Sequence, residues 1–197
     1  MKSALHIISS ARGALSYSRC LSTAIINKLI DKGEIDKVVE RDLAKASPPF
    51  LDEALIWEFY KFPEMIDERG ERLLSYANAI FNEMNEAEII VISTPMHNLG
   101  ISSLLKAWLD QLVRVGISYR FNADGTKTGC LTSKKVYLAI ASGGRLAYWP
   151  REYEFIESYI KAVFSAYAGI TDVCTYRVEG TAEPNFRVDY EGIIQNL

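Results

Sequence analysis

The sequence predicts a doubly wound α/β fold, in which helices cover both faces of a parallel sheet. Short apolar runs rich in β-branched residues alternate along the chain with longer segments of helical period, and this alternation is the signature of stacked β-α units. Five such runs are separated by four such segments. In a chain of 197 residues, this arrangement fits a flavodoxin-like three-layer sandwich with a five-stranded parallel sheet.

The elements follow from the apolar pattern, taken in chain order. We expect strands at residues 4–9, 36–41, 88–94, 135–141 and 172–178. We expect helices at residues 18–32, where Gly33 ends the pattern, at 63–86, at 101–113 and at 151–167, which Gly169 ends. The helix over 101–113 is the clearest, because its apolar residues recur at helical spacing and form one broad stripe. These residues are Ile101, Leu104, Leu105, Trp108, Leu109, Leu112 and Val113.

Size and composition limit the possible functions. The chain has a mass of 22.2 kDa and ordinary globular composition, so we expect one domain that buries its own core without a second one. A formal net charge of −3 gives no basic footprint for nucleic acid. No apolar run approaches the roughly 20 residues that span a bilayer, and no signal peptide begins the chain, so we expect a cytoplasmic protein with no membrane contact.

The three cysteines indicate neither a disulfide framework nor a metal site. Cys20, Cys130 and Cys174 are far apart and lack the C-x-x-C spacing of zinc ligands. We therefore expect free thiols and no bound metal.

Three loops are the candidate functional segments. Ligands of doubly wound folds bind beyond the carboxyl ends of the strands, and in this sequence the strands run into residues 9–18, 95–100 and 142–150. We expect these loops to converge on one edge of the sheet.

The first loop is rich in hydroxyl groups. Ser10, Ser16 and Ser18 precede or begin the first helix, where unpaired N–H groups and the helix dipole favour an anion. Gly13 is the single glycine of the loop, and a dinucleotide fingerprint needs three, while no Gly-Lys-Ser/Thr closes a P-loop. A cradle for one terminal phosphate remains, and the alternative is that Ser16 or Ser18 only caps the helix.

The second loop can contact a planar heterocycle. Asn98 offers hydrogen-bond donors and acceptors, Met96 offers a polarizable contact, and Gly100 permits a close turn. The alternative is a simple connector in which Asn98 or Ser102 caps the next helix.

The third loop contains two adjacent glycines directly after a strand. Gly143 and Gly144 suit a turn with positive φ and would let the backbone approach a ligand without interference from a Cβ atom. A plain turn is the alternative.

These residues together resemble a known family. "SS" at 9–10 with "SYS" at 16–18, "PMHN" at 95–98 followed by "SSLLKAWLDQLVRVGISYRF", and "SGGR" at 142–145 resemble the FMN-dependent NADH azoreductases and quinone reductases. Members of this family are flavodoxin-like, and some are described as acyl carrier protein phosphodiesterases. The resemblance covers the chain up to the fifth strand, and its middle block is the most specific part.

The resemblance implies one FMN-binding domain over residues 1–197 and NADH or NADPH as the electron donor. The FMN phosphate would be held by Ser10, Ser16, Tyr17 and Ser18. The isoalloxazine would be lined by Met96, His97, Asn98, Leu99, Ser142, Gly143, Gly144 and Arg145. Both substrates would use the same flavin face, which implies ping-pong turnover.

The chain departs from the family pattern at three places. His97 stands where the family usually has an aromatic residue such as tyrosine, the third loop has Ser-Gly-Gly-Arg in place of Ser-Arg-Gly-Gly, and the chain after Gly180 is short. His97 is the candidate catalytic residue, which would stabilise the reduced flavin or act as a general acid for the reduced acceptor. The alternative is that its ring points to solvent or only fills the aromatic slot. His6, inside the first strand, is expected to be a core histidine.

Two aromatic groups are candidates for the acceptor side of the site. Trp57, Phe59, Tyr60 and Phe62 precede Pro63 in an irregular stretch, whose default role is core packing and whose alternative role is a wall over the flavin or a subunit contact. Tyr119 and Phe121 alternate along an extended segment and so point to one side. By the resemblance, Phe59, Tyr119 and Phe121 line the substrate, and a homodimer completes the site.

The leading hypothesis is an oxidoreductase that passes two electrons from NADH or NADPH through FMN to a quinone, an azo compound or a similar small aromatic acceptor. One alternative is a flavodoxin-type electron carrier that does not itself oxidise NAD(P)H. Another is a phosphodiesterase, which would need a nucleophilic serine beside one of the two histidines, His6 and His97.

Overall fold

The computed structural model describes residues 2–197 and contains a five-stranded parallel sheet in the order β2-β1-β3-β6-β7. Its strands are β1 Lys2–Ile8, β2 Ile35–Asp42, β3 Ile89–Pro95, β6 Lys135–Ala141 and β7 Asp172–Val178. The order reverses between β1 and β3, which is the topology of a flavodoxin-like fold. The predicted fold class and all five strands are confirmed.

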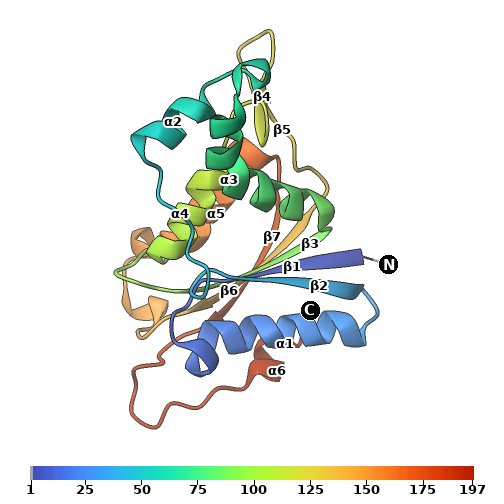
Figure 1. The fold of residues 1–197 in the computed structure, drawn as a ribbon. Coiled ribbons are helices and arrows are strands. Elements are labelled where there is room, and N and C mark those ends of the chain that lie inside the picture. The colour runs from blue at the N-terminus through green and yellow to red at the C-terminus, as the bar shows by residue number, and fades with distance from the viewer. Residues whose placement is uncertain (1) are drawn as a thin grey trace.

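Helices form a layer on each face of the sheet, as Figure 1 shows. The helices are α1 Tyr17–Asp31, α2 Glu53–Phe59, α3 Glu68–Glu86, α4 Ser103–Leu112, α5 Ile156–Val163 and α6 Tyr190–Ile193. α1 and α6 lie on one face, and α3, α4 and α5 lie on the other.

Alternation along the strands gives each helical layer its own core. In β3, Ile89 and Val91 pack with α1, while Ile90 and Ile92 pack with α3, α4 and α5. All four side chains are buried, because successive residues of a strand face opposite sides of the sheet and both sides are covered.

Two predicted helices begin later than expected. α3 begins at Glu68 because the side chain of Asp67 caps it, accepting a hydrogen bond from the N–H of Gly70 at 2.8 Å. Residues Pro63–Met65 form a separate 3₁₀ turn. The last predicted helix is also interrupted, since a 3₁₀ turn occupies Arg151–Tyr153 and a π-helical turn at Phe164–Ala168 follows α5.

Three elements were missed by the sequence prediction. They are α2, the short helix α6 and β5 Lys127–Gly129. β5 pairs in antiparallel fashion with β4 Tyr119–Phe121 to form a hairpin. The extended segment at β4, with both aromatic rings on one side, was predicted and is confirmed. α2 and the hairpin lie together at the upper end of the molecule in Figure 1, away from α1. No helix within residues 2–197 is long and apolar enough to cross a membrane.

Candidate cofactor-binding site

The three loops selected from the sequence meet at the carboxyl edge of the sheet. The N–H of Ser9 donates to the carbonyl of Ser93 at 3.1 Å, and the N–H of Met96 donates to that of Ala141 at 2.7 Å. The N–H of Ser142 donates in turn to the carbonyl of Val178 at 2.9 Å. This series of hydrogen bonds links the ends of adjacent strands, so the predicted convergence is confirmed.

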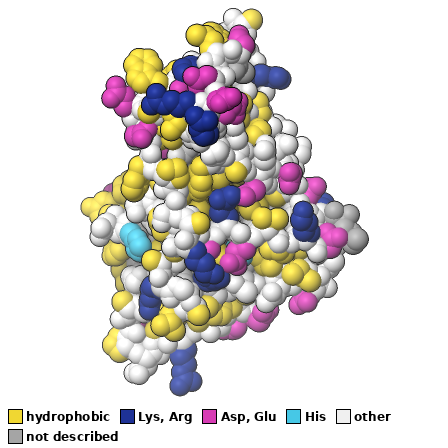
Figure 2. Space-filling model, in the orientation of Figure 1, with side chains coloured by type: hydrophobic (Ala, Val, Ile, Leu, Met, Phe, Trp, Pro, Cys, Tyr) yellow, Lys and Arg dark blue, Asp and Glu magenta, His cyan; other side chains and the backbone are white. Residues whose placement is uncertain are grey.

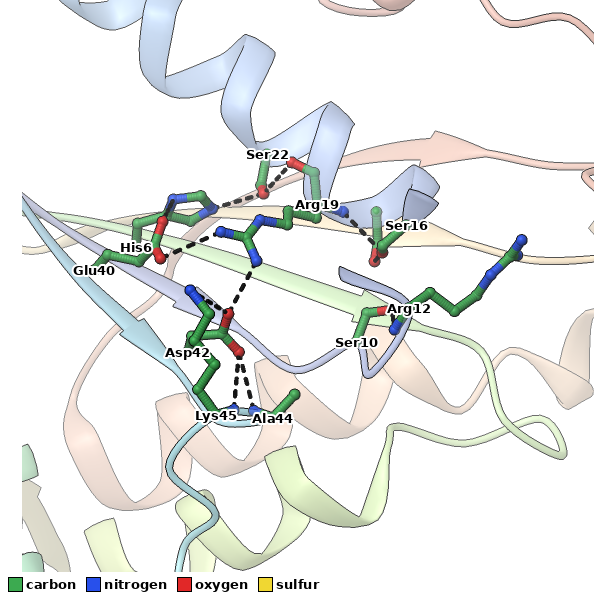
Figure 3. Close-up of polar contacts among 11 residues, drawn as sticks. His6, Ser10, Arg12, Ser16, Arg19, Ser22, Glu40, Asp42, Ala44 and Lys45 are labelled. Atoms are coloured by element: carbon green, nitrogen blue, oxygen red, sulfur yellow. Dashed lines mark hydrogen bonds and ion pairs between the residues drawn. The ribbon is translucent and has the colours of Figure 1, made fainter. Parts of the chain in front are cut away.

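The first loop gathers its serine hydroxyls below the start of α1 (Figure 3). Ser16 is the N-cap of α1, and its Oγ accepts a hydrogen bond from the N–H of Arg19 at 3.3 Å. The Oγ atoms of Ser16 and Ser18 lie 3.2 Å apart, so one of their two protons bridges them and the other is free to donate. The Oγ of Ser10 accepts from the N–H of Arg12 at 3.4 Å. Capping and anion binding are therefore compatible in this loop.

An ion-pair network anchors the first turn of α1 to β2 (Figure 3). The guanidinium of Arg19 donates to the carboxylate of Asp42 at 2.9 Å and pairs with that of Glu40 at 3.3 Å. The Asp42 carboxylate also accepts hydrogen bonds from the N–H groups of Ala44 and Lys45. The ammonium of Lys45 also pairs with Asp42, at 3.7 Å. Because two cations, Arg19 and Lys45, balance the two carboxylates, the acids oppose an anion at the loop much less than free carboxylates would.

His6 is a buried core histidine, as predicted. Its Nε2 lies 2.7 Å from the Oγ of Ser22, and its Nδ1 lies 4.0 Å from the carboxylate of Glu40. Burial, reinforced by the charge of Arg19 and opposed by that of Asp42, lowers the pKa of His6 to about 4. The Ser22 hydroxyl is fully buried and donates to the carbonyl of Arg19, so this Ser–His pair offers no nucleophile to a substrate.

The second loop is a tight turn with unusual backbone angles. His97 and Gly100 exchange two backbone hydrogen bonds of 3.0 Å, and both central residues have positive φ, 49° at Asn98 and 69° at Leu99. This is the geometry of a type I′ turn, in which glycine or asparagine is preferred. A leucine in the left-handed region costs roughly 1 kcal/mol, and such strain is often found at ligand sites.

A large pocket opens beside this turn, between the first turns of α4 and α5. It has a volume of about 910 Å³. Its walls include His97, Asn98, Ile101, Lys106, Phe155 and Tyr159. The predicted helix over 151–167 had assigned Phe155 to the core, but it is half exposed, because α5 begins only at Ile156. Phe155 and Tyr159 therefore line the pocket, although the apolar pattern of residues 151–167 had placed them on the core face of a helix.

The third loop is held in place by the chain that follows β7. The Oγ of Ser142 donates to the carbonyl of Gly144 at 2.7 Å, and the N–H and Oγ1 of Thr181 both donate to the carbonyl of Ser142 at 3.1 Å. Arg145 makes a two-fold hydrogen bond to the carboxylate of Glu183, at 2.6 and 2.7 Å. This contact raises the pKa of Arg145 and lowers that of Glu183.

One of the two expected reasons for the glycines of this loop, a turn with positive φ, is wrong. Neither Gly143 nor Gly144 has a positive φ. A Cβ on Gly144 would lie 3.0 Å from the Trp149 ring, and one on Gly143 would lie 3.4 Å from the Cβ of Ala182. Glycine is thus favoured by close packing within the loop, and most clearly at Gly144.

The three predicted substrate-lining residues do not lie at this edge of the same chain. Phe59 borders a separate cavity of about 310 Å³ between α2, α3 and residues 114–117. Tyr119 and Phe121 lie on the hairpin, which packs against Ala168 and Gly169, just before β7 begins. Trp57, Tyr60 and Phe62 are largely exposed, so the default expectation of core packing was wrong for them.

The residues present fit a phosphate-bearing planar cofactor. The first loop offers hydroxyl donors and the N–H groups of Tyr17 and Ser18, which helix geometry leaves without intrahelical partners. Arg12 is exposed, with its guanidinium 5.7 Å from the centre of the Tyr17 ring, and adds positive charge beside the loop. The second and third loops supply backbone and apolar walls at the same edge.

The fold and the loops define a flavodoxin-like α/β protein with a hydroxyl-rich loop at the topological switch point. The family described as having a flavodoxin-like fold matches residues 2–193. The chain belongs to this family.

Proteins with related sequences and structures carry functional names. A Beijerinckia indica protein named FMN-dependent NADH:quinone oxidoreductase is 36% identical over 96% of this chain and 93% of its own length. A Gluconobacter oxydans protein of the same name is 39% identical over 90% of this chain and 88% of its own. The crystal structure of an azoreductase from Bacillus anthracis superposes with a TM-score of 0.84 at 27% identity, covering 100% of this chain and 94% of the other.

Proposed function

We propose that this protein is an FMN-dependent oxidoreductase that oxidises NADH or NADPH and reduces quinones, azo compounds or similar aromatic acceptors. The observation that carries the proposal is the convergence of a hydroxyl-rich helix N-terminus, a strained turn and a packed glycine loop on one sheet edge. The functional names of the relatives support it. We also propose that residues 1–197 act as one FMN-binding domain in the cytoplasm.

In this proposal the first loop holds the FMN phosphate. Ser10 and the free hydroxyl of the Ser16–Ser18 pair donate through O–H groups, and Tyr17 and Ser18 donate through backbone N–H groups at the positive end of α1. The residues proposed to line the isoalloxazine are Met96, His97, Asn98, Leu99, Ser142, Gly143, Gly144 and Arg145. Bound FMN would supply the two-electron chemistry that connects NAD(P)H to the acceptor.

The protein's own contribution is positioning and proton supply. The exposed imidazole of His97 forms part of the pocket wall, where it can donate a proton to an acceptor that gains electrons. The turn at Asn98 and Leu99 fixes the backbone on which this ring stands. Because donor and acceptor would take turns in one pocket, the proposal includes ping-pong kinetics.

We propose that the working form is a homodimer. Phe59, Tyr119 and Phe121 lie away from the carboxyl edge of their own chain, so they can line an acceptor only in the site of a second copy. A two-fold axis would let each copy complete the other's site. Figure 2 shows hydrophobic side chains among charged ones over the upper end of the molecule, where α2 lies.

The experiment that tests the function starts from the purified protein with added FMN. We expect visible flavin absorption that stays with the protein on gel filtration, is bleached by NADH or NADPH without air, and returns when a quinone is added. Initial velocities at several acceptor concentrations should give parallel double-reciprocal lines. A protein that does not retain FMN contradicts the proposal, and a protein whose flavin NAD(P)H fails to bleach is an electron carrier.

A further inference from the structure

Lys127 occupies the centre of an aromatic cluster on the β4–β5 hairpin. Its Nζ lies 4.4 Å from the centre of the Tyr167 ring, 5.3 Å from that of Tyr119 and 5.7 Å from that of Phe121. All three distances are within the range in which an ammonium group is attracted to a ring. Tyr119 is also packed edge-on against both other rings. We call these four residues the Lys127 cluster.

The backbone explains why these side chains meet. In the hairpin, Phe121 is paired with Lys127 and Tyr119 with Gly129, and directly paired residues of two strands share one face. The π-helical turn Phe164–Ala168 carries Tyr167 to that face. Gly129 allows the close approach, since a Cβ there would lie 2.1 Å from the backbone nitrogen of Gly169.

The ammonium group of this cluster has no acidic partner among the described residues. Within residues 2–197, no carboxylate lies at ion-pair distance from Lys127, and its Nζ donates no hydrogen bond. Lys127 is exposed, and Phe121 is 58% exposed. The cluster thus presents an aromatic surface with an uncompensated positive charge on it.

We infer that the Lys127 cluster binds the anionic group of an aromatic acceptor, such as an aryl sulfonate or aryl carboxylate. This inference rests on the proposed function, in which the hairpin of one copy faces the flavin site of the other. The rings of Phe121 and Tyr119 offer stacking area to the acceptor. The ammonium, held by the three rings, offers charge-assisted hydrogen bonds to the acid group.

Arg120 provides the matched control. It lies between Tyr119 and Phe121 on β4, so it faces the opposite side of the hairpin. It is exposed and has no ion pair among the residues that the structure describes. Replacing Arg120 or Lys127 by methionine removes one positive charge from the same hairpin, and only the second change touches the cluster.

The test compares an anionic and a neutral acceptor on the FMN-loaded protein. We would measure the Kd of anthraquinone-2-sulfonate and of 2-(hydroxymethyl)anthraquinone by fluorescence titration, together with their KM values in NADH-driven reduction. Lys127→Met should raise the Kd and KM of the sulfonate about tenfold, as expected for loss of one charge-assisted contact. The values for the neutral compound should stay within about twofold, and Lys127→Arg should retain preference for the sulfonate.

Three results would overturn the inference. If Lys127→Met and Arg120→Met weaken sulfonate binding equally, the sulfonate is attracted only by the overall positive charge of the hairpin and makes no specific contact with Lys127. If Lys127→Met weakens the binding of the anionic and the neutral compound equally, the cluster contributes only packing to acceptor binding. If it changes neither, the cluster is not at the acceptor site. The Kd measurement needs no turnover, so a protein that binds the sulfonate through Lys127 but is not reduced by NADH would contradict the proposed function alone.

Discussion

Among individual residues, Ser16 has the clearest double role, since one hydroxyl caps α1 and belongs to the proposed phosphate cradle. Asp67 caps α3 in the same way without any place in the cradle. We expect Ser16→Ala and Asp67→Ala each to lower the free energy of unfolding by about 1 kcal/mol. Only Ser16→Ala should weaken FMN binding, roughly tenfold for the loss of a hydrogen bond to a charged group. Denaturant unfolding and a fluorescence titration separate the two effects; equal FMN affinity in both variants would leave Ser16 as a cap alone.

The second prediction for a single residue concerns His97, whose ring forms part of the pocket wall. If the imidazole donates a proton to the acceptor, turnover with a quinone should fall as the pH rises, because fewer rings then carry the proton. His97→Tyr keeps a flat ring and should flatten that part of the profile. Flavin content should be the same in both proteins. An unchanged pH profile in the variant means that the ring contributes packing only.

At the scale of elements, the packing of β1 against α1 makes the fold sensitive to acid through His6. Its pKa is about 4 in the folded protein and near 6.5 in an unfolded chain. The unfolded state therefore binds more protons between these values, and stability falls as pH drops through this window. From pH 7.5 to 5 the loss due to His6 is about 2 kcal/mol. His6→Gln, which can keep a hydrogen bond to Ser22, should lose less stability than wild type over the same range in denaturant titrations; an equal loss would contradict this origin.

The contact between the hairpin and the π-helical turn gives a second prediction for an element. A Cβ at Gly129 would lie 2.1 Å from the backbone nitrogen of Gly169 and 2.2 Å from the carbonyl carbon of Ala168, far inside van der Waals contact, and these backbone atoms cannot move aside as the end of a flexible side chain can. We expect Gly129→Ala to lower the free energy of unfolding by about 2 kcal/mol, within the range for overpacking. Gly100→Ala is the control, because its Cβ would meet its nearest neighbour at 3.8 Å. A stable Gly129→Ala protein would show that the hairpin is not held by this contact.

The sequence predicted the elements whose patterns are long and missed those whose structure depends on distant contacts. The apolar stripe of α4 and the five strand runs carry their signal within one segment, and all are present. β5 has three residues, too few for a periodic signal, and its pairing with β4 depends on a contact between separate segments. The role of Gly144 depends on the packing of Trp149, which no local pattern contains. The three loops of the site could be predicted because strand ends fix them, whereas Phe155 could not, because its exposure depends on where α5 begins.

At the scale of the whole molecule, the distribution of aromatic residues remains unexplained by one chain. Trp57, Tyr60 and Phe62 are 65%, 76% and 68% exposed, and such aromatic surface is enriched at the centres of protein interfaces. It lies near the hairpin and away from the carboxyl edge where FMN is proposed to bind. A two-fold dimer accounts for both facts, since the aromatic surface of each copy would cover the site of the other.

The dimer makes a prediction that separates cofactor binding from acceptor reduction. Sedimentation at micromolar concentration should give twice the 22.2 kDa mass of one chain. Trp57→Glu places a carboxylate in the exposed aromatic surface that is proposed to form the interface and should shift the protein toward monomer, because an unpaired charge is costly to bury. The variant should still bind FMN through the first loop, which belongs to one chain, but should reduce acceptors at least about tenfold more slowly, since the rings that hold them would be lost. Ile30→Glu is the control, because it also replaces an exposed apolar residue by a carboxylate, but on α1, in the helical layer that covers the other face of the sheet. This variant should remain dimeric and active. A wild-type monomer that reduces quinones at full rate would show that Phe59, Tyr119 and Phe121 do not act across a subunit interface.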